Sequence, residues 1–180
     1  MILQQPLAFI DIETTGLDYE KGEIIELGVV IAELRDGALT VTDEIDLKIA
    51  PKHIETADAQ ALRINGYNEA EWIFAVSIEE ALKLFVERTA GAVFVAHNIT
   101  FDYGFIEANL RRYGFEHKMH YHKLDTLALA FGVLQNNDDM GKLSLRALCE
   151  KYGIENKKAH SAFADAYATY EVFKKLLNLK

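Results

Sequence analysis

Residues 7–17 read Leu-Ala-Phe-Ile-Asp-Ile-Glu-Thr-Thr-Gly-Leu, an apolar run that ends in two carboxylates, Asp11 and Glu13. The apolar part predicts a β-strand, in which successive side chains alternate between two faces. Asp11 and Glu13 are therefore expected to point the same way, on the face that also carries Phe9. Two anions side by side at the end of a buried strand lose hydration and repel each other, at a cost of several kcal/mol. A divalent cation would remove that cost, so the segment predicts a metal site.

The composition of the chain indicates one compact domain. The chain has 180 residues, half of them apolar, and only 2 prolines. That length supplies one core and is short for two, so we expect a single domain over residues 1–180. No apolar run reaches the roughly 18 residues that span a bilayer, and no secretory signal is recognisable, which predicts no membrane association and a cytoplasmic location. The single cysteine, Cys149, lies in an apolar helical stripe and is expected to be buried and unreactive.

The net charge of −9 counts against a polyanionic partner, because affinity for nucleic acid depends largely on Lys and Arg. Two features weaken that argument. Several of the acids would be metal ligands, and the bases are clustered, with Lys142, Arg146 and Lys151 on one expected helix and Lys157 and Lys158 just before His160. A solvated helix face is the alternative for the first group. The charge therefore does not exclude nucleic acid as a substrate.

The order of strand and helix signals is typical of a mixed α/β sheet. Residues 23–34 are rich in β-branched side chains and 38–49 alternate in polarity, which predicts a hairpin beside the first strand. Ser77 and Glu80 have the spacing of a capping box at the start of a helix. The elements expected after that helix are a strand over 92–96, a helix over 102–113, a strand over 121–124, a helix over 143–152 and a helix over 161–177. Helices are thus expected on both faces of the sheet.

Further polar residues fall near expected strand ends and helix starts. Asp102 begins the helix that follows the strand over 92–96, and His160 and Asp165 lie at the start of the last helix. Five residues correspond to about 140° around a helix, so His160 and Asp165 cannot share a helical face. We expect His160 on the preceding loop and Asp165 in the first turns. Active sites gather at the carboxyl ends of strands in such sheets. The residues expected to converge on a two-metal hydrolytic site are Asp11, Glu13, Asp102, His160 and Asp165.

Three segments contain these residues. They are Phe9-Ile10-Asp11-Ile12-Glu13-Thr14-Thr15-Gly16-Leu17, His97-Asn98-x-x-Phe101-Asp102 and Ala159-His160-x-Ala162-x-x-Asp165-Ala166. In order and identity, the segments resemble the three motifs of the DnaQ-like 3′→5′ exonucleases, in the subclass with a histidine in its third motif. The resemblance implies a ribonuclease-H-like fold, two Mg²⁺ or Mn²⁺ ions, and release of nucleoside 5′-monophosphates from a 3′ end.

The same resemblance implies a role for each signature residue. Asp11 would be shared by both ions, Glu13 and Asp165 would bind the first, and Asp102 would bind the second through water. Hard oxygen ligands of this kind suit Mg²⁺ and Mn²⁺. His160 would be the general base, since an imidazole with a pKa near 6.5 can take a proton from water near neutral pH.

The resemblance also implies a pocket for the substrate. Thr14, Thr15 and Leu17 would line the site of the terminal nucleotide, and Asn98 and Phe101 would flank the scissile nucleotide. Apolar and aromatic side chains accept any base, so little sequence preference is expected. A core position remains the alternative for Phe101.

Two other polar features have competing interpretations. Asp125 either supports the metal site or caps the helix that follows it. His117, His120 and His122 invite a zinc interpretation, which lacks a nearby cysteine or acid at ligand spacing.

The expected function is metal-dependent 3′→5′ hydrolysis of single-stranded nucleic acid, with DNA favoured over RNA. Free 3′ ends would be the substrate, and a polymerase or another replication or repair protein is a candidate partner. The alternatives are RNA 3′-end processing or degradation of short oligonucleotides, hydrolysis of small dinucleotides, and a non-catalytic nucleic-acid-binding domain. The last alternative predicts the loss of at least one signature residue, yet all five are present.

Overall fold

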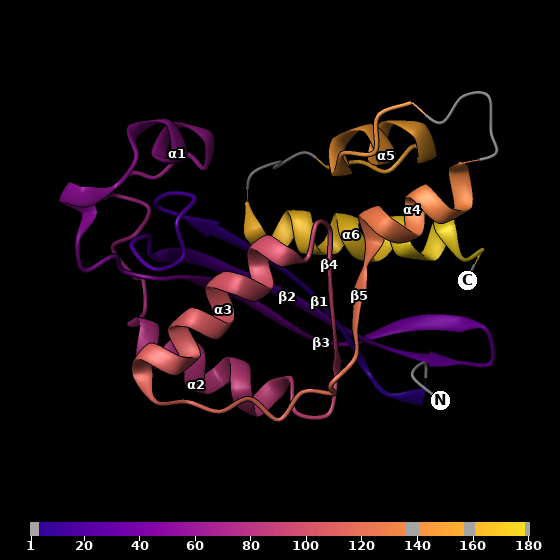
Figure 1. The fold of residues 1–180 in the computed structure, drawn as a ribbon, viewed down its shortest axis with the longest axis horizontal. Coiled ribbons are helices and arrows are strands. Elements are labelled where there is room, and N and C mark those ends of the chain that lie inside the picture. The colour runs from indigo at the N-terminus through magenta and orange to yellow at the C-terminus, as the bar shows by residue number, and fades with distance from the viewer. Residues whose placement is uncertain (1–3, 136–140, 157–160, 179–180) are drawn as a thin grey trace.

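The structure is a computed structural model that describes residues 4–135, 141–156 and 161–178. Within these ranges, five strands form one sheet in the order β3-β2-β1-β4-β5 (Figure 1). The strands are β1 (Leu7–Thr14), β2 (Ile24–Arg35), β3 (Ala38–Lys48), β4 (Val93–Ala96) and β5 (Lys123–Asp125). The β1–β2 and β2–β3 pairs are antiparallel, whereas β1–β4 and β4–β5 are parallel. The predicted mixed sheet is confirmed.

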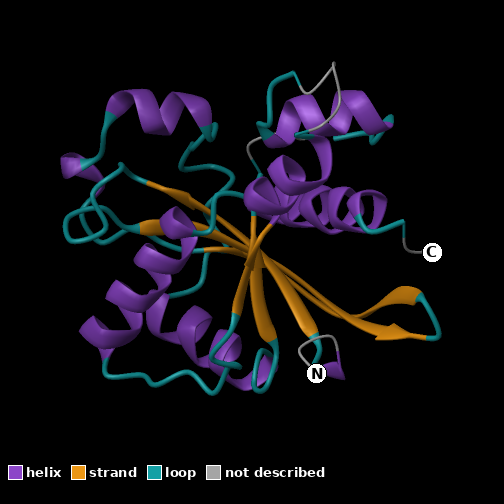
Figure 2. Cartoon of the chain, turned by 45° about the vertical axis from the view of Figure 1, so that its right-hand side comes forward, coloured by secondary structure: helices purple, strands orange, loops and turns teal. Residues whose placement is uncertain are grey.

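Helices cover both faces of this sheet, as predicted (Figure 2). They are η2 (Ile54–Thr56), α1 (Ala59–Ile64), α2 (Ile78–Arg88), α3 (Thr100–Tyr113), α4 (Thr126–Leu134), α5 (Leu145–Tyr152) and α6 (Ala162–Leu176). Helices α2 and α3 lie on one side of the sheet and α6 on the other, with α4 and α5 packed against α6 (Figure 1). No helix in the described ranges is long and apolar enough to cross a lipid bilayer.

Several predicted boundaries are confirmed and others need correction. The capping box is present, since Ser77 Oγ accepts a hydrogen bond from Glu80 N and Glu80 Oε2 accepts one from Ser77 N. Helix α3 begins two residues earlier than expected, at Thr100. Strand β5 lies over 123–125 rather than 121–124, because its register is set by pairing with β4. Helix α5 begins at Leu145 rather than 143, because the hydroxyl of Ser144 caps it.

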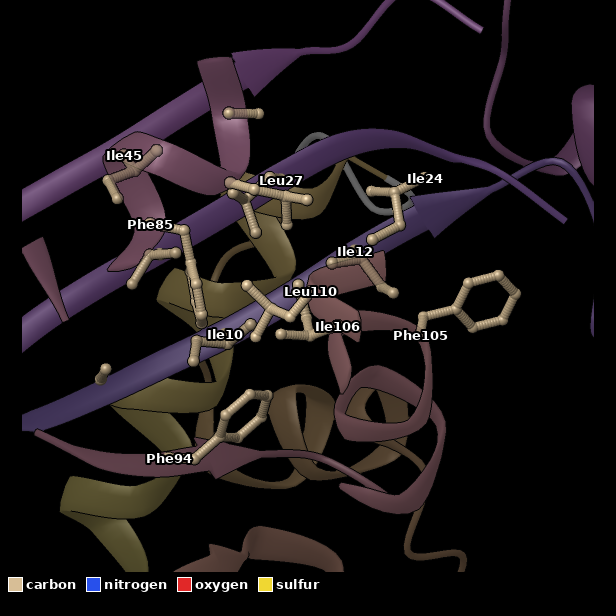
Figure 3. Close-up of a cluster of buried hydrophobic side chains, with 14 of the residues drawn as sticks. Ile10, Ile12, Ile24, Leu27, Ile45, Phe85, Phe94, Phe105, Ile106 and Leu110 are labelled. Carbon is tan, nitrogen blue, oxygen red and sulfur yellow. The ribbon is translucent and has the colours of Figure 1, made fainter. Parts of the chain in front are cut away.

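The alternation of side chains along β1 places one core cluster on each face of the sheet. Ile10 and Ile12 pack with residues of α2 and α3, among them Phe85 and Ile106 (Figure 3). The opposite face carries Phe9, which packs against α6. Side chains on this second face, further along β1, therefore project toward the start of α6, and Asp11 and Glu13 belong to that face.

Candidate active site

Three carboxylates meet where the end of β1 lies beside the start of α6. Asp11 and Glu13 come from β1 and Asp165 from the first turn of α6. One carboxylate oxygen from each lies within 4.8 Å of the other two, and all three side chains are partly buried. In the part of the chain that the structure describes, these three residues are the acids or histidines that lie close enough together to share one metal ion.

Asp102 lies beside this cluster, on the far side of the β1 backbone from β2. The pairing of β1 with β4 runs only from Leu7 to Phe9, so the later residues of β1 have no neighbouring strand on that side. The buried Asp102 carboxylate fills the gap, where its Oδ1 accepts a hydrogen bond of 3.1 Å from Ile12 N. This contact fixes Asp102 next to Asp11, although its oxygens are outside the three-residue group.

Burial raises the pKa values of Asp11, Glu13 and Asp102, and the charges of neighbouring carboxylates add to the shifts. Burial is the largest cause of the raised pKa of Asp11, followed by the charges of Asp102 and Asp165. Burial, Asp165 and Glu26 raise the pKa of Glu13 from 4.5 to about 8. Burial raises the pKa of Asp102 to about 7, although the Ile12 N–H opposes the shift. Three carboxylates with raised pKa values, together with the neighbouring carboxylate of Asp165, are a donor set that a divalent cation would neutralise, so these residues fit hard cations such as Mg²⁺ or Mn²⁺.

We expect Glu13→Gln to stabilise the metal-free protein, and to stabilise it more at about pH 8.5 than at about pH 5.5. Because the pKa of Glu13 rises on folding, the folded state binds more protons than the unfolded state between pH 4.5 and about 8. Glu13 therefore lowers the stability of the folded state as the pH rises through this interval. The measurement is the difference in Tm between variant and wild type in chelator, expected to grow by several °C. A difference that shrinks with pH would contradict the electrostatic description.

The start of α6 lies directly on β2, which places Asp165 above β1. Gly28 is opposite Asp11 in the β1–β2 register, on the same face. A Cβ atom at Gly28 would lie 2.3 Å from backbone atoms of Ala162 and Phe163, so only glycine allows this approach. Asn156 completes the support, since its Nδ2 donates a hydrogen bond to Asp165 Oδ1.

Gly28→Ala is expected to destabilise the protein by about 1–3 kcal/mol, because its methyl group would push the start of α6 off β2. Gly132→Ala is the matched control. Gly132 lies within α4, where an added Cβ would meet no heavy atom within 4 Å beyond the backbone of its own helix, so the same change should stabilise the helix by about 0.5–1 kcal/mol. Urea unfolding of both variants measures the two effects. Equal stability of the two variants would contradict the close contact between α6 and β2.

The two threonines expected to line the nucleotide pocket have their hydroxyls engaged within the loop after β1. Thr14 Oγ1 donates to Gly16 O at 2.8 Å, and Thr15 Oγ1 accepts from Glu23 N at 2.8 Å. Both residues are buried, and Asn65 Nδ2 also donates to Thr14 O. The side chains of Thr14 and Thr15 therefore stabilise the loop. A ligand would contact the backbone of this loop and the residues beside the two threonines.

Leu17 is 84% exposed, so its side chain is accessible to a ligand. Together with Thr15 and Gly16, it lines a cavity of about 540 Å³ at the loop that follows β1. The other lining residues are Asp18, Lys21, Gly22, His53, Thr56 and Asp58.

Asn98 lies between β4 and α3, and Phe101 lies in the first turn of α3. Asn98 adopts a left-handed backbone conformation, with φ of 65°, and its backbone N donates to Asp125 Oδ1 at 3.0 Å. Phe101 is partly buried, packs against the α2–α3 core and contacts the ring of Phe105, with centroids 5.0 Å apart. Asp125 also accepts from Leu127 N and so caps α4, which favours the capping interpretation.

Other sequence hypotheses have different outcomes. His160, Lys157 and Lys158 lie outside the described residues. His120 Nδ1 accepts a hydrogen bond from His122 N, so this nitrogen is already engaged, and neither histidine belongs to the metal-ligand group found in the described ranges. Cys149 is buried as expected, and burial raises the pKa of its thiol.

Comparison with known proteins identifies the family. The family model described as an exonuclease matches residues 8–173, and the chain belongs to this exonuclease family. The DnaQ-like resemblance is thereby confirmed, and the chain carries an exonuclease domain.

The relatives in sequence are long DNA polymerases. The chain is 34% identical over 167 residues to the PolC-type DNA polymerase III of Staphylococcus aureus (strain bovine RF122 / ET3-1), and equally to that of Staphylococcus haemolyticus (strain JCSC1435). The match covers 93% of this chain and 11% of each polymerase, so the chain spans about a tenth of their length.

The fold is similar to that of E. coli Exonuclease I. A crystal structure of that enzyme with a dT13 oligonucleotide superposes with a TM-score of 0.77 at 19% identity, covering 97% of this chain and 41% of the other. A second structure of Exonuclease I gives a TM-score of 0.80 at 18% identity, with the same coverage. At these identities the likeness establishes the ribonuclease-H-like fold.

Proposed function

We propose that residues 1–180 form one 3′→5′ exonuclease domain that hydrolyses single-stranded nucleic acid to nucleoside 5′-monophosphates in the cytoplasm. The observation that carries the proposal is the meeting of Asp11, Glu13 and Asp165 at the end of β1, with Asp102 beside them. Membership of the exonuclease family supports the same reaction.

We assign Asp11, Glu13, Asp102 and Asp165 as the ligands of two Mg²⁺ or Mn²⁺ ions. Two such ions stabilise the attacking and the leaving oxygen of an in-line displacement at phosphorus. The raised pKa values of Asp11 and Glu13 support the assignment, because these carboxylates gain most from a bound cation. We propose His160 as the general base because of its place in the third motif. Its imidazole would accept a proton from the attacking water.

We propose that the terminal nucleotide occupies the cavity beside Leu17, where the exposed side chain would contact the base. The backbone of the loop held by Thr14 and Thr15 would face the sugar, and Asn98 and Phe101 would border the scissile nucleotide. An apolar contact of this kind selects no particular base, which supports low sequence specificity.

DNA is the substrate that the comparisons favour. The sequence relatives are DNA polymerases, and structures with the same fold contain DNA oligonucleotides. We propose a polymerase or another replication or repair protein as the partner, because the relatives carry the matching segment within a much longer polymerase.

The test is a time course with three substrates, namely 5′-labelled single-stranded DNA and RNA of one sequence and a labelled dinucleotide, in Mn²⁺, Mg²⁺ or chelator. A metal-dependent ladder from the 3′ end, faster on DNA, is expected. A faster ladder on RNA would assign the domain to RNA processing, and cleavage of dinucleotides alone would assign it to that smaller substrate. Absence of cleavage on all three would contradict the proposal and leave a binding domain.

A further inference from the structure

A fifth carboxylate, Glu26, lies on the same face of the sheet as the acidic cluster. It is directly opposite Glu13 in the β1–β2 register, and it is only 6% exposed. Its charge contributes to the raised pKa values of Asp11 and Glu13. A buried carboxylate in this place adds repulsion to a site that already contains four acids, so its presence requires another explanation.

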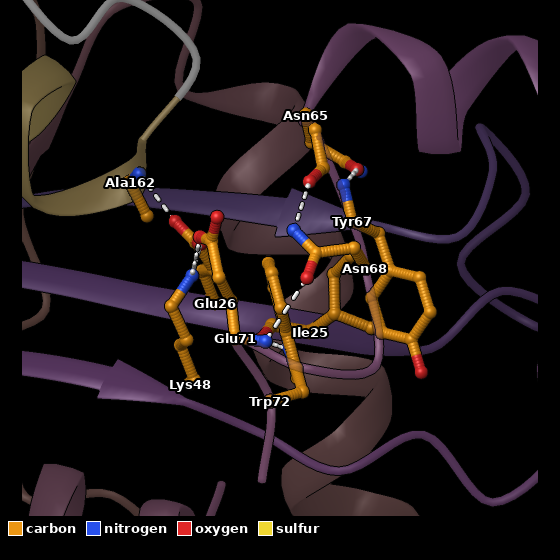
Figure 4. A network of polar contacts seen from close by, with 10 residues as sticks. Ile25, Glu26, Lys48, Asn65, Tyr67, Asn68, Glu71, Trp72 and Ala162 are labelled. Carbon is orange, nitrogen blue, oxygen red and sulfur yellow. Dashed lines mark hydrogen bonds and ion pairs between the residues drawn. The ribbon is translucent and has the colours of Figure 1, made fainter. Parts of the chain in front are cut away.

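Both oxygens of Glu26 have partners, and neither partner belongs to the acidic cluster (Figure 4). Oε2 accepts a hydrogen bond of 3.0 Å from Ala162 N, and Oε1 accepts one of 2.9 Å from Lys48 Nζ. Glu26 is also outside the group of acids that lie within metal-sharing distance. Both oxygens of Glu26 therefore accept hydrogen bonds from groups outside the acidic cluster.

The contact with Ala162 replaces a local cap. Ser161 is the N-cap residue of α6, and its side chain makes no capping hydrogen bond. The first N–H of the helix is instead satisfied by Glu26, which is 136 residues away in sequence. A carboxylate is favoured at a helix N-terminus, because the N–H groups and the helix dipole present positive charge there.

The partner Lys48 is itself held in place. Its Nζ lies 3.5 Å from the centroid of the Trp72 ring and 3.8 Å from Glu71 Oε2. Trp72 is buried, and its Nε1 donates to Ile25 O at 3.1 Å, next to Glu26 in β2 (Figure 4). The ion pair with Lys48 and the contacts around it fix the position of Glu26 on the sheet.

We infer that Glu26 is a positioning residue for the proposed metal site. Asp165 is three residues after Ala162, in the first turn of α6, so the anchor on Ala162 N sets the distance from Asp165 to Asp11 and Glu13. Glu26 touches neither the metal nor the substrate and acts through α6. This inference rests on the proposed function, and it assigns a role to a residue outside the signature motifs.

The test compares Glu26→Ala and Glu26→Gln with Glu33→Ala. Glutamine retains an oxygen that can accept from Ala162 N, whereas alanine retains none. Glu33 lies on the same strand and forms an ion pair with Arg35 away from the cluster, so it controls for loss of a glutamate from β2.

For Glu26→Ala, we expect Mn²⁺ affinity measured by calorimetry to fall about 10- to 100-fold, as for the loss of a residue that orients a metal ligand. The kcat should fall while KM for the oligonucleotide stays within about twofold, because the substrate contacts are unchanged. Glu26→Gln should recover most of both quantities, and Glu33→Ala should match the wild type. Wild-type Mn²⁺ affinity in Glu26→Ala would overturn the inference. Equal losses in the alanine and glutamine variants would also overturn it, because a direct role of the charge would then be indicated.

Amide hydrogen exchange tests the anchor without metal or activity. In Glu26→Ala, the amides of residues 162–165 should exchange about tenfold faster than in the wild type, while those of the central part of β1 stay protected. Unchanged exchange at 162–165 would overturn the inference. If the wild type neither binds Mn²⁺ nor hydrolyses nucleic acid, the proposed function fails, and this experiment still decides whether Glu26 holds α6.

Discussion

Asp11→Asn should lower kcat on single-stranded DNA by at least about three orders of magnitude, because the remaining acids cannot hold both ions of a two-metal site. Asp11 is the central acid of the cluster. Its carboxylate lies within metal-sharing distance of Glu13 and Asp165, and the charge of Asp102 contributes more than any other charge to its raised pKa. Asparagine has the same shape and no charge. The substitution therefore removes the ligand and leaves the packing of β1 intact.

The expected loss can be separated from a loss of folding. Asp11→Asn removes one of several repelling charges, so the metal-free variant should be at least as stable as the wild type in thermal unfolding. Asp36→Asn is the matched control, since Asp36 is exposed in the turn between β2 and β3 and has a positive φ that asparagine tolerates. Turnover near the wild-type rate in Asp11→Asn, with metal still required, would contradict the assignment of Asp11 as the shared ligand.

Local periodicity was enough to predict the first half of the site. Because strand side chains alternate, the sequence alone places Asp11 and Glu13 on one face, and the structure places both toward α6 with Phe9. The position of Asp165 beside these two acids could be expected from the resemblance to the exonucleases and from its place at the start of a helix.

The supports of the site could not be predicted, because they depend on contacts between distant segments. The Glu26–Ala162 hydrogen bond joins residues 136 positions apart, and Gly28 matters only because α6 lies on β2 at that point. The signal in the sequence is a single carboxylate and a glycine inside the otherwise apolar run 24–32. In a buried strand each of these is costly unless another element requires it.

Helix α4 was recognisable only through its cap. Its sequence, Thr126–Leu134, is apolar on nearly every side, so no helical stripe of apolar residues stands out. In the structure one side of α4 packs against α6, while Phe131 and Val133 remain exposed. The Asp125 side chain at its start, which also binds Asn98 N, was the usable signal.

His160→Ala should lower kcat by about 10²- to 10⁴-fold while Mn²⁺ affinity and oligonucleotide KM stay near wild-type values, because a general base acts in the chemical step alone. In the wild type the rate should rise with pH through a value near 6.5, since only the neutral imidazole can accept the proton of the attacking water. That rise should be absent from the variant. His122→Ala, an exposed histidine preceding β5, is the matched control and should keep the wild-type profile. If His160→Ala keeps the wild-type rate from about pH 6 to 9, His160 is not the base. If it instead raises KM alone, His160 acts in binding, and the proton of the attacking water must go to another acceptor.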